Sequence, residues 1–533
     1  MKGITGRLLL LLISGLGMGL GNAADVSEVA TESGIFAGSK SQHQGLVTVF
    51  KGIGYAAPPV RDLRWKPPVA AIPFAGVRQA DRTGPACWQG QNSDATLYAR
   101  GNLERSEDCL YLNVFTGAAD SRDALPVMVW FHGGSNTAGH AGPLIFDGAN
   151  LAARGAVIVT ANYRLGALGF LAHPGLTAES EQHSSGNYGL LDQLAVLRWV
   201  RNNIAGFGGD PGRVTIFGQS AGGADVCLLM SSPLADGLMH GVIGQSPSEC
   251  ITLDTELDQG HVMGEAFAGR LGVAETGSAA VAKLRALDPE TVISTPGVGG
   301  TPLIDGWVIP ERPYDLLATG RQNRIPVMVG GLADEYHGLS HSAPEISEPQ
   351  LDEYLRTSFG NAAERIKANY TAALAESPLD ARKRIATDNS FLLASRMWGR
   401  LVSERGDQAY VYYFSRPAPV FRLYVHERPD LYNDGGQRRF GAYHSGELAY
   451  VFDNLGLVGI GWDAADRALS ETMADYWVSF ARNGNPNADG LPNWPVYNPD
   501  EDLVQVLDTR VYSAVHPRHD QLDDLEQLYL QSR

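Results

Sequence analysis

The sequence predicts an α/β protein with a large, mostly parallel central sheet flanked by helices. Short apolar runs rich in β-branched residues, such as 125–131 and 155–160, have the composition of strands buried on both faces. Stretches with helical spacing of apolar residues, such as 189–204, alternate with these runs. Strands that alternate with helices are joined by right-handed crossovers, which produce a parallel sheet.

The predicted elements continue along most of the chain. Residues 45–68 alternate short apolar runs with Gly-Pro turns, which is typical of antiparallel strands. Further buried strands are predicted at 213–217, 242–244, 325–330 and 409–414, and a further helix at 221–230. Residues 345–405 are expected to form a helical lobe beside the sheet. The sequence contains no linker-like stretch, so residues 24–533 are predicted to form one domain.

The first residues resemble a secretory signal peptide. Lys2 and Arg7 precede an apolar run over 8–20, and Gly21-Asn22-Ala23 offers a small-x-small cleavage site. The run is short for a membrane span, so removal of residues 1–23 is favoured over a retained anchor. We therefore expect an exported protein, periplasmic or extracellular, without a stable membrane anchor.

The net charge and the cysteines indicate which partners and which disulfides to expect. The 42 Lys+Arg against 59 Asp+Glu give a formal net charge of −17, which disfavours nucleic acid as a partner. In an oxidising compartment, Cys87 and Cys109 would close a short loop worth roughly 3 kcal/mol. Cys227 falls in the predicted helix 221–230, so a free buried thiol is slightly favoured over a bridge to Cys250. The oligomeric state is left open.

One pentapeptide is a candidate for a catalytic serine. Gly218-Gln219-Ser220-Ala221-Gly222 lies between the predicted strand 213–217 and the helical stretch that follows it. In this setting a tight elbow exposes the serine above the sheet, and the flanking glycines relieve crowding. An ordinary glycine-rich turn is the alternative interpretation. The context favours Ser220 as the nucleophile of an α/β-hydrolase fold.

A nucleophilic serine needs a histidine base and an orienting acid, which follow it along the chain in this fold. Asp334 and Glu335 come after the strand 325–330, and His444 comes after the strand 409–414. Loops at the carboxyl edge of a sheet meet the active site. The residues alone leave the choice between Asp334 and Glu335 open, and a solvated acidic turn or a surface histidine is the alternative for each.

The loop after the strand 125–131 is a candidate oxyanion hole. Its sequence is His132-Gly133-Gly134-Ser135. Backbone N–H groups of Gly134 and Ser135, joined by that of Ala221, would donate to the oxyanion, while Gly133 mainly permits the path of the loop and could share the role. His132 is expected to be structural, because no acid stands beside it.

Motifs along nearly the whole mature chain resemble the type-B carboxylesterase family, which includes cholinesterases and bacterial p-nitrobenzyl esterases. In the order of the family they are 107–114, 162–166, 187–193, 207–211, 217–223, 473–477 and 484–487. The resemblance implies an α/β-hydrolase fold with a helical lobe inserted toward the C-terminal half. It also implies a serine ester hydrolase that needs no cofactor and acts on small-molecule esters.

The resemblance also assigns individual residues. It implies Ser220, Glu335 rather than Asp334, and His444 as the catalytic triad, with Glu447 three residues after the histidine. It further implies a Cys87–Cys109 disulfide and a buried Arg64–Glu107 pair. We expect a structural role for that pair, because a buried ion pair is costly to break.

The chain departs from the family pattern at a few places. Ser135 stands where many members have a third glycine, so it would narrow or decorate the pocket. Members that bind choline have a glutamate before the serine and an indole in the disulfide loop. Here Gln219 takes the first place and Tyr98-Ala99 the second, and Trp88 lies too close to Cys87 to match, so a cholinesterase is disfavoured.

The predicted function is hydrolysis of carboxylic esters through an acyl-enzyme. A lipase and an esterase for bulky aromatic esters are the alternatives within the enzymes. A catalytically silent binding or adhesion module is the alternative from another class, disfavoured because every triad member is present. No metal is expected: His337 and His341 have helical ligand spacing, but no third ligand pattern accompanies them.

Overall fold

The computed structural model describes residues 26–91, 97–248, 250–425 and 437–533. The signal peptide predicted at 1–23 lies outside these residues. Among the helices of the described part, none combines the length and the apolarity needed to span a bilayer.

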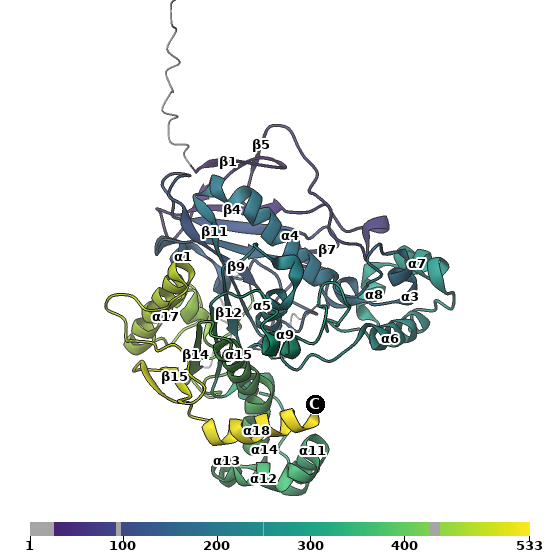
Figure 1. Cartoon of the computed structure of the whole chain (residues 1–533). Helices are drawn as coiled ribbons and strands as arrows, with labels where there is room; N and C mark the ends of the chain where they lie inside the picture. The colour runs from purple at the N-terminus through teal and green to yellow at the C-terminus, as the bar shows by residue number, and fades with distance from the viewer. Residues whose placement is uncertain (1–25, 92–96, 249, 426–436) are drawn as a thin grey trace, which may run out of the picture.

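A sheet of 11 strands runs through the centre of the described chain, in the order β16-β15-β14-β13-β12-β11-β9-β10-β8-β4-β3 (Figure 1). Neighbouring strands are parallel from β10 to β15, and the strands at both edges are antiparallel. The predicted mostly parallel sheet is therefore confirmed. Its strands are β3 (Ser39–Lys40), β4 (Thr48–Gly54), β8 (Tyr111–Thr116), β9 (Leu125–Phe131), β10 (Val157–Ala161), β11 (Gly209–Gln219), β12 (Gly241–Gln245), β13 (Val327–Leu332), β14 (Ala409–Phe414), β15 (Leu503–Leu507) and β16 (Tyr512–Val515).

Smaller sheets and the helices surround this layer. In Figure 1, α1 and α17 lie to the left of the sheet strands and α4, α5 and α9 to their right, while α11–α14 form a lobe below that α18 crosses. The small strands are β1 (Glu28–Thr31), β2 (Gly34–Ala37), β5 (Val77–Gln79), β6 (Ala86–Cys87) and β7 (Arg105–Ser106). The α-helices are α1 (Ala149–Ala153), α2 (Gly166–Phe170), α3 (Pro174–Glu179), α4 (Tyr188–Asn203), α5 (Ala221–Ser231), α6 (Leu257–Arg270), α7 (Gly277–Ala286), α8 (Pro289–Ser294), α9 (Pro313–Thr319), α10 (Glu335–Leu339), α11 (Glu348–Phe359), α12 (Ala363–Ala368), α13 (Thr371–Glu376), α14 (Pro378–Thr387), α15 (Leu393–Glu404), α16 (Leu448–Val451), α17 (Ala464–Asn483) and α18 (His519–Ser532).

Two of the predicted strands begin two residues before the corresponding strands of the structure. The runs 125–131 and 409–414 coincide with β9 and β14, but β10 starts at Val157 and β13 at Val327. Gly155 adopts a φ of +90°, outside the strand region. Pro326 has no N–H to contribute to a ladder. Neither residue is part of a strand, and β10 and β13 begin after them.

Two disulfides join the four cysteines. The predicted Cys87–Cys109 bridge is present, with Cα atoms 4.9 Å apart. The slight preference for a free Cys227 was wrong, because Cys227 is bonded to Cys250 with a Cα–Cα distance of 6.0 Å. The reason is topological: α5 connects β11 to β12, which are neighbours in the sheet, so the segment after β12 passes the helix that carries Cys227.

The Arg64–Glu107 pair forms with bidentate geometry. The Arg64 Nε and Nη2 atoms donate to the Glu107 carboxylate at 2.7 and 2.6 Å. Arg64 also donates to the backbone carbonyl of Leu287 at 2.7 Å, which connects distant parts of the chain. These contacts support the proposed structural role of the pair.

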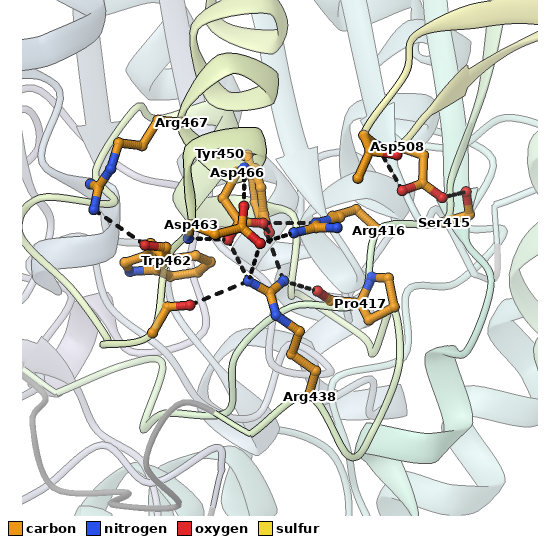
Figure 2. A network of polar contacts seen from close by, with 12 residues as sticks. Ser415, Arg416, Pro417, Arg438, Tyr450, Trp462, Asp463, Asp466, Arg467 and Asp508 are labelled. Atoms are coloured by element: carbon orange, nitrogen blue, oxygen red, sulfur yellow. Dashed lines mark hydrogen bonds and ion pairs between the residues drawn. The ribbon is translucent and has the colours of Figure 1, made fainter.

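A second ionic network fixes the segment around His444 (Figure 2). Asp466, fully buried near the start of α17, accepts hydrogen bonds from Arg416 and Arg438, and from Tyr450 Oη at 2.9 Å. Arg416 lies two residues after β14, and Arg438 precedes His444 in the chain. Tyr450 lies in α16, which follows His444. The network therefore holds the histidine-bearing segment from both sides.

Replacement of Asp466 by asparagine should destabilise the fold strongly. Burial would raise the pKa of Asp466, but hydrogen bonds from Arg438 and Arg416 outweigh it and hold the pKa well below its ordinary value. The contribution of this carboxylate is therefore present above about pH 4 and lost as the pH falls further. We expect Asp466→Asn to lower the free energy of unfolding by about 3 kcal/mol in urea titrations at neutral pH.

Asp508→Asn is the matched control for that variant. Asp508 accepts from Ser415 Oγ at 2.8 Å beside the network (Figure 2). Among the described residues, Asp508 accepts only from neutral donors, Ser415 and the Thr509 N–H at 2.6 Å, so its replacement should cost about 1 kcal/mol. Equal losses in the two variants would contradict a special role for Asp466.

Candidate active site

Ser220 lies on a tight turn between β11 and α5. Its backbone has φ 59° and ψ −125°, a conformation that non-glycine residues rarely adopt. A Cβ at Gly218 would come within 2.3 Å of the Gly222 carbonyl oxygen, and one at Gly222 within 2.1 Å of the Phe131 carbonyl oxygen. Only glycine fits at either position. The pentapeptide therefore has the geometry of a nucleophile elbow rather than of an ordinary loop.

His444 and Glu335 form a short hydrogen bond. The Glu335 Oε2 atom lies 2.6 Å from His444 Nδ1, and both side chains are buried. The other carboxylate oxygen, Oε1, accepts from Ser246 Oγ at 2.7 Å and from the Leu332 backbone N–H at 2.9 Å. The acid is thus held on one edge by fixed donors and presents its other edge to the imidazole. Ser220 and His444 line the same chamber.

Asp334, the alternative acid, points elsewhere. Its carboxylate accepts from the Ala442 backbone N–H at 3.0 Å and from Arg384 at 3.4 Å. His337 bonds Asp380 at 2.7 Å, and His341 Nδ1 lies 2.8 Å from the Gly338 carbonyl oxygen. Among the described residues, no cluster of three or more His, Cys, Asp or Glu side chains could hold a metal ion.

The predicted oxyanion loop packs directly against the elbow. A Cβ on Gly133 would lie 2.9 Å from the Ser220 Cβ, so this stretch of backbone touches the serine. Gly134 has φ +117° and Ser135 has φ +54°. No acceptor among the described residues bonds the backbone N–H of Gly134, Ser135 or Ala221. These donors are therefore free to bind a ligand oxygen beside Ser220.

Buried polar groups brace this loop from behind. Asn136 donates to Asp225 at 2.9 Å, and Tyr163 Oη donates to the His132 carbonyl oxygen at 2.6 Å. The His132 ring stacks on Tyr163 with centroids 4.6 Å apart. Burial lowers the pKa of His132 to about 4, so the ring is neutral. These contacts are those of the structural histidine that the sequence predicted.

A further set of groups around His444 was missed by sequence reasoning. Gln219 Nε2 lies 3.2 Å from His444 Nε2, and Gln219 Oε1 accepts from Ser445 Oγ at 3.1 Å. Tyr424 Oη donates to Ser445 Oγ at 2.8 Å. Ser246, which donates to Glu335, was also missed. It follows the carboxyl end of β12, at the same sheet edge where the sequence placed Glu335 and His444. The same signal could have identified it.

Glu447, three residues after His444, is fully buried. It accepts from Gln245 Nε2 at 3.0 Å, and Gln245 in turn accepts from the Trp477 indole at 3.2 Å. Burial, and then the charge of Glu335, raise the pKa of Glu447 to about 8. Burial also raises the pKa of Asp225 to about 7. Both carboxyls therefore keep protons at pH values where unfolded carboxyls have lost them.

These raised pKa values predict that stability falls as the pH rises. The folded protein binds more protons than the unfolded chain between the ordinary and the raised pKa, so deprotonation favours unfolding. The lowered pKa of His132 acts in the opposite direction, but only below about pH 6.5. We expect the free energy of unfolding to decrease by roughly 2 kcal/mol from about pH 6.5 to about pH 8, mostly through Glu447.

Urea unfolding of the Glu447→Gln variant at both ends of this pH range tests the assignment. The variant lacks the titrating group, so its stability should decrease by less than half as much as that of the parent. An unchanged decrease would show that other groups cause the pH dependence.

Two chambers meet at Ser220. The larger, about 860 Å³, is lined by Ser220, His444 and Phe391, and by the end of α18. The smaller, about 240 Å³, is lined by Ser220, Ala221 and the segment 299–302. Ser135 and Ser248 line both. The site can therefore hold a ligand whose two halves extend on either side of the serine.

Comparison with known proteins finds esterases that are similar to this chain over most of its length. The model of the carboxylesterase family matches residues 25–523. The chain is 36% identical to fumonisin B1 esterase of Sphingopyxis macrogoltabida, over 85% of this chain and 82% of that protein. It is 32% identical to human cocaine esterase, over 94% and 90% of the two chains.

The solved structures give the same result. The carboxylesterase EST55 of Geobacillus stearothermophilus superposes with a TM-score of 0.80 at 31% identity, covering 94% of this chain and all of that one. A p-nitrobenzyl esterase structure superposes with a TM-score of 0.78 at 30% identity, covering 94% of this chain and 99% of the other. These matches confirm the α/β-hydrolase fold predicted from the sequence.

Proposed function

The chain belongs to the carboxylesterase family and is a carboxylic ester hydrolase, and we propose that it works through a triad of Ser220, His444 and Glu335. The observation that carries the proposal is the buried 2.6 Å contact between Glu335 and Nδ1 of His444, the histidine that lines the same chamber as Ser220. A contact to Nδ1 leaves Nε2 as the ring atom that can accept a proton.

The first half-reaction forms an acyl-enzyme. Ser220 Oγ attacks the ester carbonyl carbon while its proton passes to His444 Nε2, and the imidazolium is stabilised by Glu335. The carbonyl oxygen becomes an oxyanion within reach of the N–H groups of Gly134, Ser135 and Ala221, with Gly133 shaping the loop. The C–O bond to the alcohol then breaks, and the His444 proton goes to the leaving oxygen.

The second half-reaction restores the serine. Water attacks the acyl carbon while His444 accepts its proton, and the same donors hold the second oxyanion. The acid leaves and the proton returns to Ser220 Oγ. No step requires a cofactor, since the proton and the developing charge are handled by side chains and backbone N–H groups.

A covalent probe tests the proposal. Incubation with a fluorophosphonate should add one phosphonyl group, located by peptide mass spectrometry on Ser220, and should abolish hydrolysis of p-nitrophenyl acetate. Turnover of p-nitrophenyl esters from acetyl to palmitoyl separates the candidates, because a preference for the longest chains would favour a lipase. An unlabelled, inactive protein would favour the silent binding module.

We also propose that the enzyme is exported as a single catalytic domain after loss of residues 1–23. The two disulfides support this, because such bonds form in oxidising compartments. N-terminal sequencing of the secreted protein should find a start near Ala24. Recovery of the intact N-terminus on membranes would contradict cleavage.

A further inference from the structure

The two chambers at Ser220 can be assigned to the two halves of an ester. The imidazolium of His444 gives its proton to the departing alcohol, so the alcohol must leave on the side that His444 faces. His444 lines the larger chamber and is absent from the described lining of the smaller one. The larger chamber therefore receives the alcohol portion, and the smaller receives the acyl portion next to the Ala221 N–H.

The size of the acyl chamber limits the acid. Its volume of about 240 Å³ corresponds to roughly eight water-sized groups at about 30 Å³ each. Pockets for drug-sized ligands begin at about 300 Å³. Part of the space must also hold the oxyanion. A short acyl group fits within this chamber, whereas a fatty acyl chain would have to extend beyond it.

The wall of the alcohol chamber is rich in hydroxyl and amide groups. Thr252, Asn389 and Ser390 all line it, each open to solvent or half-buried. The side chains of Thr252 and Asn389 form no hydrogen bond with any described residue, so both are available to a ligand. The described lining contains one acidic residue, Asp254, and no lysine or arginine. A charged carboxylate or phosphate on the alcohol therefore finds no lysine or arginine partner in the described lining.

We infer that this enzyme prefers esters of a short acid with a bulky, uncharged, hydroxyl-bearing alcohol. The inference rests on the proposed function, since it assumes attack by Ser220. The hydroxyls of such an alcohol would exchange hydrogen bonds with Thr252 and Asn389, which an alkyl alcohol of the same size would leave unmatched.

A matched pair of substrates tests this. Glucose 6-butyrate and hexyl butyrate share the acid, and both are esters of a primary alcohol on six carbons; they differ in the hydroxyl groups and in the pyranose ring of the sugar. We expect kcat/KM, measured as butyrate release, to be at least about tenfold higher for the sugar ester. Glucose 6-laurate, with the same alcohol and a long acid, should be hydrolysed at least about tenfold less efficiently than glucose 6-butyrate.

A double variant tests the named side chains. Thr252→Val and Asn389→Leu remove the polar groups at similar volume, and should lower the preference for the sugar ester at least about fivefold. Thr472→Val, on α17 outside both chambers, is the control and should keep the ratio of the parent. A parent ratio at or below one would overturn the inference, and an equal loss on both butyrates would overturn the role of these side chains.

The same experiments separate this inference from the proposed function. If the enzyme is labelled by the fluorophosphonate and hydrolyses p-nitrophenyl acetate but prefers hexyl butyrate, the substrate class is wrong and the triad stands. If labelling and p-nitrophenyl acetate hydrolysis both fail, the triad itself is wrong.

Discussion

Replacement of Ser220 by alanine should lower kcat on p-nitrophenyl acetate by at least about 10⁴-fold, because no acyl-enzyme can form. The oxyanion donors and His444 remain in the variant, so a small residual rate above that in water is expected. The fluorophosphonate adduct should disappear completely. The measurement is the steady-state rate of p-nitrophenol release together with the intact mass after labelling.

Ser231→Ala is the matched control, because it makes the same change at the far end of α5, the helix that Ser220 precedes. Ser231 Oγ donates to the Cys227 carbonyl oxygen at 3.1 Å, within α5 and away from both chambers. It should keep activity within a few fold and cost about 1 kcal/mol of stability. Ser220→Ala should unfold at the temperature of the parent, since alanine adopts the same backbone turn at similar strain. A variant that keeps a hundredth of the activity would exclude Ser220 as the nucleophile.

The tight turn at Ser220 could be predicted because its determinants are local. The strand, the two glycines and the helix around Ser220 are contiguous in the sequence, and each constrains the same turn. The positions of Glu335 and His444 could be predicted less directly. They follow strands that end at one edge of the sheet, so their loops had to converge there.

Features that depend on side-chain direction could not be predicted from the residues. The choice between Asp334 and Glu335 depends on which carboxylate faces His444, and neighbours in the sequence differ only in direction. The Cys227–Cys250 bridge depends on how the segment after β12 crosses α5. The missed contact of Gln219 with His444 joins side chains from segments 225 residues apart.

The chambers depend on still longer connections. The alcohol chamber brings Ser135 together with Ser532 at the end of α18. Nothing in the spacing of these residues indicates that they share a wall. The fold class and the catalytic chemistry therefore follow from short motifs and their order, while specificity depends on loops and helix ends that only the folded chain brings together.

Glu335→Gln should lower kcat by about 10⁴-fold without disturbing the fold. The Leu332 N–H donates to Glu335 Oε1 at 2.9 Å and cannot act as an acceptor. In the variant, the glutamine oxygen must therefore occupy this position, and its NH₂ group must face His444 Nδ1. An N–H donor there forces the ring proton onto Nε2, so the histidine loses the lone pair that receives the serine proton.

Asp334→Asn tests that argument at the neighbouring position. Its carboxylate bonds the Ala442 N–H and Arg384 rather than His444, so kcat should fall by less than about tenfold while stability decreases by about 1 kcal/mol. A KM close to that of the parent is expected in Glu335→Gln, because the substrate chambers are untouched and only the proton transfer is blocked. Equal losses of kcat in the two variants would mean that a general disturbance of the acidic turn, and not the tautomer of His444, sets the rate.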